Sequence, residues 1–154
     1  MRTDDGRGAN VKFTTKAEYG LAALADIAMH SERSERTTTA EIAQRQHISH
    51  KYLEQILVQL RQANLIRSVK GQKGGYTLMH PASCIHISDV LNALDSTILA
   101  DAPEITDDSG LRRNIKDCLW DKMNGAMRDY TEHMTLAELL ESELCPDDNG
   151  TYVI

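Results

Sequence analysis

The sequence contains few aromatic residues and few prolines: among 154 residues there are one phenylalanine, one tryptophan and three prolines. This composition favours a helix-rich chain over a β-sandwich. No apolar run approaches the ~18 residues that a membrane-spanning helix needs. The first ten residues, MRTDDGRGAN, contain no apolar core of the kind found in secretory signals. The chain is therefore expected to be cytoplasmic, with no membrane partner.

Cysteine is also scarce, and its spacing excludes a local metal-ligand motif. Cys84, Cys118 and Cys145 are separated by 34 and 27 residues, whereas a CxxC-type motif places its cysteines within a few residues. Thiols placed in this way in a cytoplasmic chain are expected to be reduced. The sequence also contains no nucleophile–base pair and no phosphate-binding loop. We therefore expect no enzymatic activity and no cofactor.

Acidic residues outnumber basic residues by 23 to 17, but the two halves of the chain differ in sign. Residues 1–80 carry a net charge of +4, whereas residues 81–154 carry −10. A basic front joined to an acidic back is common in proteins that read DNA with one part and bind a partner with the other. Chance surface charge would give the same asymmetry, so other features of the sequence must decide whether the chain binds DNA.

Two helices separated by a tight turn are predicted between residues 38 and 63. Thr38 and Glu41 match a capping box that opens a short helix ending near Gln46. Ser49 can cap a longer helix, whose apolar residues recur at helical spacing: Tyr52, Leu53, Ile56, Leu57 and Leu60. This is the layout of a helix-turn-helix, although a plain helical hairpin has the same pattern.

A glycine-rich basic segment, SVKGQKGGY at residues 68–76, follows the second helix. Residues with strand propensity flank it, which predicts a two-stranded β-hairpin with a cationic tip. Glycines let the tip lie close to a phosphate chain, and Lys70 and Lys73 have no acidic neighbour to pair with, so they can neutralise phosphates. A nucleotide-binding loop is the rival interpretation, but GQKGG lacks the P-loop spacing. We interpret the hairpin as the wing of a winged helix-turn-helix.

The predicted fold is therefore mainly α with a small β wing. Residues 1–10 are expected to be a disordered extension, and residues 11–87 to form the DNA-binding domain, whose first helix has a capping-box pattern at Thr15 and Glu18. Residues 88–142 are expected to form a dimerisation region, in which Ser88 caps a short helix and an acidic loop follows. Residues 143–154 are expected to form a tail.

Residues 111–133 are predicted to form one long helix, because apolar residues recur there every three or four positions. At 1.5 Å per residue this helix is roughly 35 Å long. Its apolar stripe must pack on the DNA-binding domain or on a second copy of the chain. We favour the homodimer, since proteins that read operators commonly bind as two-fold dimers.

Four segments in this order, KFTTKAEYGLAAL, ISHKYLEQILVQLRQANLIRSVKGQKGGYTL, ISDVLNAL and LW…MTLAELLE, resemble the Rrf-two family of bacterial winged-helix transcription regulators. The similarity covers about residues 12–142. It implies a homodimer on a pseudo-palindromic operator in double-stranded DNA. By position it implies DNA contacts from the second helix and the wing, at Ser49, Lys51, Tyr52, Gln55 and Lys70. The chemistry agrees, because Gln can pair with an adenine edge and Lys with phosphates.

The chain departs from one pattern of the family. Its cluster-binding members carry three closely spaced cysteines in the loop before the long helix, whereas residues 95–114 here contain neither cysteine nor histidine. An iron–sulfur cluster needs about four soft or imidazole ligands close together. We therefore expect a repressor of cysteine and sulfur metabolism genes, similar to the cluster-free members of CymR type. An iron–sulfur or redox-sensing regulator of the same fold is the alternative.

The C-terminal residues Tyr152, Val153 and Ile154 suggest a partner site. An apolar C-terminus with a free carboxylate is a shape that terminal-carboxylate pockets bind. Control by O-acetylserine sulfhydrylase, which the resemblance to CymR-type repressors implies, predicts that the tail docks in that enzyme. The alternative is that these residues cover the dimerisation helix.

Overall fold

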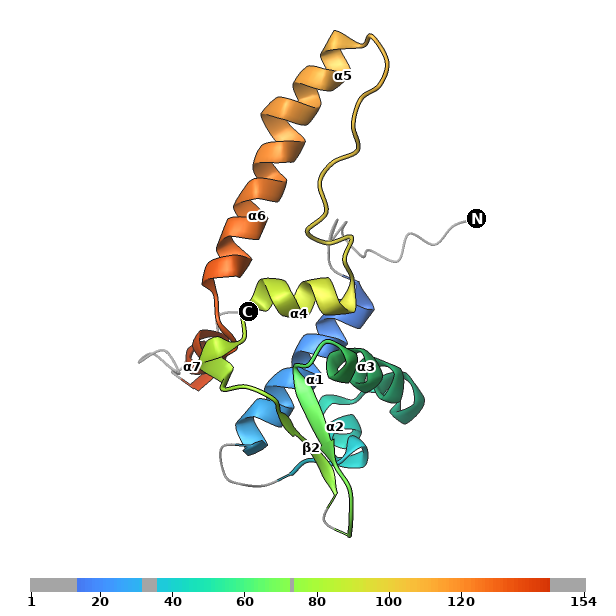
Figure 1. Ribbon diagram of the computed structural model, residues 1–154, viewed down its shortest axis with the longest axis vertical. Helices are drawn as coiled ribbons and strands as arrows, with labels where there is room; N and C mark the ends of the chain where they lie inside the picture. Colours follow the sequence, from blue (N-terminus) through green and yellow to red (C-terminus); the bar gives the residue numbers. More distant parts are fainter. Residues whose placement is uncertain (1–13, 32–35, 73, 145–154) are drawn as a thin grey trace.

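The computed structural model describes residues 14–31, 36–72 and 74–144 (Figure 1). The helices in chain order are α1 (Thr15–Ser31), α2 (Thr39–Gln46), α3 (His50–Gln62), α4 (Ile87–Leu94), α5 (Gly110–Ile115), α6 (Asp121–His133) and α7 (Leu136–Leu144). Strands β1 (Ile66–Val69) and β2 (Gly75–Leu78) form one antiparallel hairpin. A 3-10 turn, η1 (Ala82–Cys84), precedes α4, and a π-helical stretch, η2 (Lys116–Trp120), joins α5 to α6. The predicted fold class, mainly α with a small β wing, is confirmed.

Helix α1 is the centre of the compact half of the molecule. It packs against α2, α3, α4 and β2, and its side chains Leu24 and Ile27 are fully buried. Helix α4 approaches α1 closely at Gly20, where an added Cβ would lie 2.4 Å from the Leu94 side chain. Helix α4 also packs against α3 and α6, so it connects the helix-turn-helix to the long helix. The division of the chain after residue 87 stays a prediction.

The helix starts agree with the predicted capping patterns at Thr38 and Ser49 and differ from them at Thr15 and Ser88. The Thr38 N–H donates to Glu41 Oε2 at 2.7 Å, and the same reciprocal bonding joins Thr135 and Glu138. The expected box at Thr15 and Glu18 is wrong, because Thr14 Oγ1 instead accepts from the Ala17 N–H at 3.2 Å.

Ser88 does not cap α4 as expected. The N-cap is His86, and the helix begins at Ile87, two residues before the start that a Ser88 cap would give. The Ile87 N–H donates to the Met134 carbonyl at 2.9 Å. Burial of Ile87 against Ala17 and Leu91 fixes this start, and it leaves Ser88 inside the first turn with its side chain buried.

The structure has a helical rod from Gly110 to His133, made of α5, η2 and α6, that projects from the compact half (Figure 1). The loop over residues 95–109 runs back alongside this rod. Three of its carboxylates pair with basic residues of the rod: Asp101 with Arg128 at 2.6 Å, Glu104 with Lys116 at 3.6 Å, and Asp107 with Arg112. The helix that follows the acidic loop thus neutralises part of its charge.

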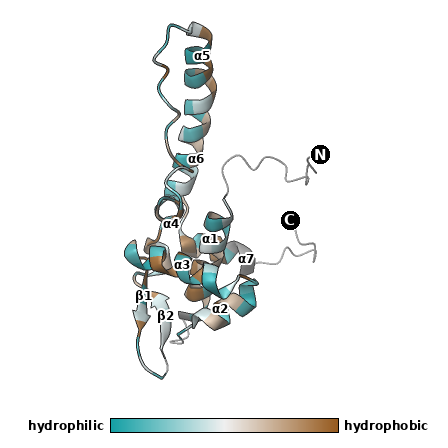
Figure 2. Ribbon diagram, turned by 90° about the vertical axis from the view of Figure 1, so that its right-hand side faces the viewer, coloured by the Kyte–Doolittle hydropathy of each residue, from teal (hydrophilic) through white to brown (hydrophobic). Residues whose placement is uncertain are grey.

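The rod leaves large apolar side chains in solvent, and Figure 2 shows hydrophobic colour along it. The exposed side chains are Leu111, Ile115, Leu119, Trp120, Met123 and Tyr130. Single exposed apolar residues are ordinary, but a row of them on one projecting helix marks an interaction surface. In the described ranges, no helix combines the length and the apolar character required to cross a bilayer.

Candidate nucleic-acid interface

Helix α3 is held in the core by one face and exposes the other. Its buried residues are Leu53, Ile56, Leu57 and Leu60, none more than 1% exposed. Lys51, Glu54 and Gln55 lie on the exposed face. The predicted contacts Lys51 and Gln55 are therefore accessible on a helix whose orientation is fixed by its packing.

Ser49 and Tyr52 also have local roles. Ser49 Oγ accepts a hydrogen bond from the Tyr52 N–H at 3.3 Å and so caps α3, which leaves its hydroxyl hydrogen available to a phosphate. The Tyr52 ring is half-buried and packs edge-on against Tyr19, with ring centres 5.9 Å apart. Tyr52 thus contributes to packing between α1 and α3 as well as to the surface.

Glu54 is a residue of the exposed face that the sequence reading did not select. Its carboxylate lies 3.5 Å from His50 Nδ1, one turn earlier on α3, and both side chains are more than half exposed. A carboxylate here disfavours nearby phosphates but can accept from the amino group of cytosine. The signal that could have found it is its position next to Gln55 on the same helix.

The wing follows α3 after three residues, and its register pairs Ile66 with Leu78 and Val69 with Gly75. Lys70 is exposed directly after β1. Gly71 has a backbone φ of 122°, in the left-handed region that residues other than glycine rarely adopt. Its carbonyl accepts a hydrogen bond from the Gly74 N–H at 2.9 Å. The tip is therefore a tight turn that presents Lys70 to solvent. Lys73 lies outside the described residues.

Thr37, which the sequence reading missed, joins the wing to the start of the helix-turn-helix. The Tyr76 N–H donates to the Thr37 carbonyl at 2.8 Å, and the Thr37 N–H donates back to the Tyr76 carbonyl at 3.3 Å. An added Cβ at Gly75 would lie 2.7 Å from the Thr37 carbonyl oxygen. Glycine at this position therefore permits the close approach that sets the position of the wing relative to α2.

A polar cluster around the buried carboxylate of Asp26 joins α1 to α2. Arg45 donates to both carboxylate oxygens of Asp26, and Gln46 Nε2 donates to Asp26 Oδ2 at 2.8 Å. Arg45 also bonds to the Thr37 hydroxyl, so one side chain connects α1 with the segment that holds the wing. Burial acts to raise the pKa of Asp26, but the hydrogen bonds from Arg45 and Gln46 outweigh it and hold the pKa below its usual value.

The described residues do not assemble the ligands of an iron–sulfur cluster. Cys84 lies in η1 and Cys118 in η2, and both are exposed. No group of three His, Cys, Asp or Glu side chains within the described ranges is placed to hold a metal ion. The loop over residues 95–109 offers ion-paired carboxylates where a cluster would need thiolates. The residues present do not fit such a group.

A sequence profile of a known family, Rrf2, described as an iron-dependent transcriptional regulator, matches residues 13–142. The chain belongs to the Rrf2 family. The predicted membership of the Rrf-two family is thereby confirmed. Rrf2 regulators bind DNA and are typically dimeric, and the similar proteins are transcription regulators, which are not enzymes.

Three Rrf2 proteins illustrate the similarity. The HTH-type transcriptional regulator IscR of Cereibacter sphaeroides is 33% identical over 141 residues, covering 88% of this chain and 91% of its own. The structure of CymR, the global cysteine regulator of B. subtilis, has a TM-score of 0.72 at 30% identity and covers 85% of this chain and 97% of its own. The structure of T. potens IscR has a TM-score of 0.71 at 29% identity, covering 88% and 91%.

Proposed function

We propose that this chain is a homodimeric, sequence-specific DNA-binding transcription regulator. The observation that carries the proposal is the pairing of two exposed elements on one rigid frame: helix α3 with Lys51 and Gln55 in solvent, and the wing with Lys70 at its tip. Direct readout needs a helix that fits the major groove, and the wing supplies charge for the adjacent phosphates. The core under α3 and the Thr37 bridge hold the two elements in a fixed relation.

The test is a genome-wide selection of DNA fragments by the purified full-length protein, followed by binding assays on the enriched sequence. We expect a pseudo-palindromic site, because a two-fold dimer presents two copies of α3. Gln55→Ala should relax preference at one base pair of each half-site by about 1–3 kcal/mol. Gln62→Ala, an exposed glutamine at the end of the same helix, is the control and should leave the preference unchanged. Failure to enrich any sequence would contradict the proposal.

The signal to which the regulator responds is a separate part of its function. The similarity to regulators named IscR supports the alternative of an iron–sulfur-linked or redox-linked regulator more than it supports a repressor of cysteine metabolism. The resemblance to CymR supports the shared fold. We therefore propose a regulator of the IscR-like branch whose response does not use three cysteines in the loop before the long helix, since that loop contains none.

Analysis of iron and acid-labile sulfide in the anaerobically purified dimer tests this proposal. Because the described residues do not bring cluster ligands together, we expect well under one cluster per dimer. Stoichiometric iron and sulfide would show that the ligands come from elsewhere and would overturn it. A matched preparation of a regulator that binds a cluster serves as the positive control.

The predicted docking of Tyr152, Val153 and Ile154 in O-acetylserine sulfhydrylase lies outside the described residues, and the comparisons give it no support. It stays a hypothesis. A pull-down of the purified enzyme with the full chain and with a chain truncated after residue 150 tests it directly. Equal retention by both chains would remove the tail from the proposed contacts.

A further inference from the structure

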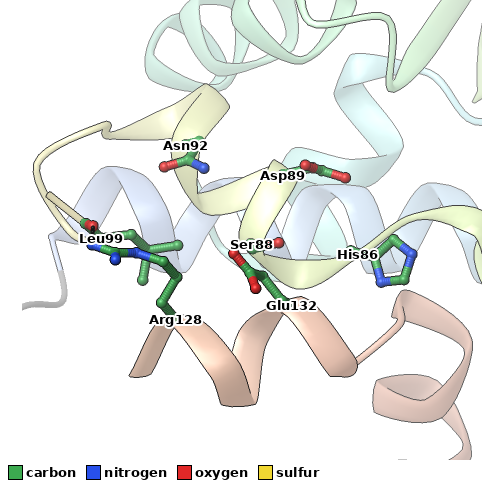
Figure 3. Close-up of a pocket in the computed structure, with 7 residues that line it drawn as sticks. All are labelled: His86, Ser88, Asp89, Asn92, Leu99, Arg128 and Glu132. Carbon is green, nitrogen blue, oxygen red and sulfur yellow. Dashed lines mark hydrogen bonds between the residues drawn. The ribbon is translucent and has the colours of Figure 1, made fainter. Parts of the chain in front are cut away.

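A polar cavity of about 320 Å³ opens between α4 and α6. Figure 3 shows side chains of α4 and its N-cap on one wall and side chains of α6 on the other. The polar residues that line it include Ser88, Asp89, Asn92, Arg128 and Glu132. The space is many times larger than a single water molecule requires. That is enough for a metabolite of low molecular weight, at the lower end of ligand sites in proteins.

The charges around the cavity favour a cation. Arg128 is already occupied, because it donates to Asp101 Oδ1 at 2.6 Å and to the Leu99 carbonyl at 3.0 Å, and these bonds raise the pKa of Arg128. Within the described ranges, the carboxylates of Asp89 and Glu132 make neither a hydrogen bond nor an ion pair. Glu132 also interacts electrostatically with Arg128, but the carboxylates of Asp89 and Glu132 outnumber this one guanidinium, which is already bonded to Asp101. The two carboxylates, one on each wall of the cavity, form a site for an ammonium group.

Ser88 supplies an independent observation. It is only 6% exposed and lines the cavity, yet its hydroxyl has no hydrogen-bond partner in the described part of the chain. The Ser88 oxygen is not among the buried atoms left unpaired in the described residues, so it opens into the cavity, where a bound group can hydrogen-bond to it. The Asn92 amide, one turn later on α4, adds a second neutral donor and acceptor.

We propose that this cavity binds a small primary amine with a second polar group, a class that includes free amino acids. The ammonium group bonds to Asp89 and Glu132, and the second polar group bonds to the Ser88 hydroxyl and the Asn92 amide. None of these four side chains belongs to the DNA interface on α3 and the wing.

The position of the cavity gives such a ligand a route to the DNA-binding elements, a consequence that rests on the proposed function. The segment that leaves the wing is joined to the end of α6 by two backbone bonds, from the Ile87 N–H to the Met134 carbonyl at 2.9 Å and from the Leu136 N–H to the Ile85 carbonyl at 2.8 Å. Glu132 lies two residues before this junction and Ser88 lies one residue after it. A ligand held by both walls therefore fixes the angle between the rod and the winged helix-turn-helix.

The experiment uses the full-length protein without DNA, so that its result does not depend on the proposed function. The twenty proteinogenic L-amino acids, ethanolamine and putrescine are screened by saturation-transfer NMR, and binders are titrated by calorimetry. We expect at least one compound to bind, with affinity reduced roughly tenfold or more by N-acetylation of the compound, by Glu132→Gln and by Asp89→Asn. Asp129→Asn, an exposed carboxylate on the same helix that does not line the cavity, should change affinity less than about twofold.

Absence of binding below about 10 mM for every compound would overturn the proposal. Equal binding by the N-acetyl derivative, or by both cavity variants, would also overturn it. Because Asp89 and Glu132 are exposed, the two variants are expected to fold, and circular dichroism checks that they do. A bound compound that leaves DNA affinity unchanged would overturn the coupling to α3 and the wing.

Discussion

Arg45 of α2 and Asp26 of α1 form a two-pronged hydrogen bond, from Nε to Oδ2 at 2.9 Å and from the terminal nitrogen to Oδ1 at 2.6 Å. The Asp26 side chain is only 2% exposed. The Arg45 side chain is 35% exposed, so its removal leaves one buried carboxylate with fewer donors and not a fully desolvated broken pair. The pair therefore sets how α2, and the turn that leads to α3, lies on the core.

Arg45→Ala should reduce the free energy of unfolding by about 1–3 kcal/mol, because it leaves the Asp26 carboxylate buried with Gln46 as its remaining side-chain hydrogen-bond donor. Urea titration followed by circular dichroism measures the change. Gln44→Ala, an exposed substitution on the same helix, should change stability by less than about 0.5 kcal/mol. Equal losses of unfolding free energy in the two variants would show that the Arg45–Asp26 pair contributes no more than an exposed side chain.

The same pair predicts a pH dependence. The folded pKa of Asp26 is lowered, since its hydrogen bonds outweigh burial, so the unfolded chain binds the proton more readily. The stabilisation is fully present above the unfolded pKa of about 3.9 and is lost as the pH falls through the lower folded pKa. The difference in urea midpoint between wild type and Arg45→Ala should therefore narrow between pH 7 and pH 2. A constant difference would contradict this assignment.

Gly75→Ala should weaken DNA binding by displacing the wing. The added Cβ would lie 2.7 Å from the Thr37 carbonyl oxygen, which is backbone and cannot turn away. We expect a loss of about 1–3 kcal/mol in stability, typical of overpacking, and weaker binding to the selected operator. Gly125→Ala in α6, where an added Cβ meets nothing within 4 Å, should retain full DNA binding in the same anisotropy assay.

Lys70→Ala should reduce the salt dependence of DNA binding. Each phosphate contact contributes about 0.9 to the slope of log K against log salt concentration, and Lys70 is exposed at the wing tip. We expect the slope to fall by about one, with little change in sequence preference. Lys122→Ala on α6 removes one positive charge far along the chain from the interface and should leave the slope unaltered. An unchanged slope in the Lys70 variant would exclude a phosphate contact there.

Leu119→Glu should convert the dimer to a monomer, because Leu119 lies in the exposed apolar row of the rod. A carboxylate placed in an apolar interface must be desolvated without a partner, which costs several kcal/mol. Sedimentation equilibrium measures the dissociation constant. Asp117→Lys, an exposed change on the same π-helical stretch, is the control and should leave the dimer intact. A monomeric wild type would contradict the proposed assembly.

The helix-turn-helix and the wing could be predicted because their signals are local. The capping box at Thr38, the apolar spacing from Leu53 to Leu60, and glycines where the chain must turn are all read over a few residues. The same reasoning failed at Ser88 and at Thr15. There the helix starts depend on what the preceding residue contacts, which short patterns do not contain.

The amino-acid sequence by itself determined the element order, the polar outer edge of α3, the cationic wing tip and the absence of cysteine from the loop before the rod, because these properties belong to single segments. Tertiary structure alone decided that Arg45 bonds to Asp26, that Thr37 holds the wing, and that Ser88, Asp89 and Glu132 surround one cavity. The partners on different elements are between 19 and 44 positions apart in the chain. Their energies depend on distance, burial and orientation, which exist only once the helices have packed.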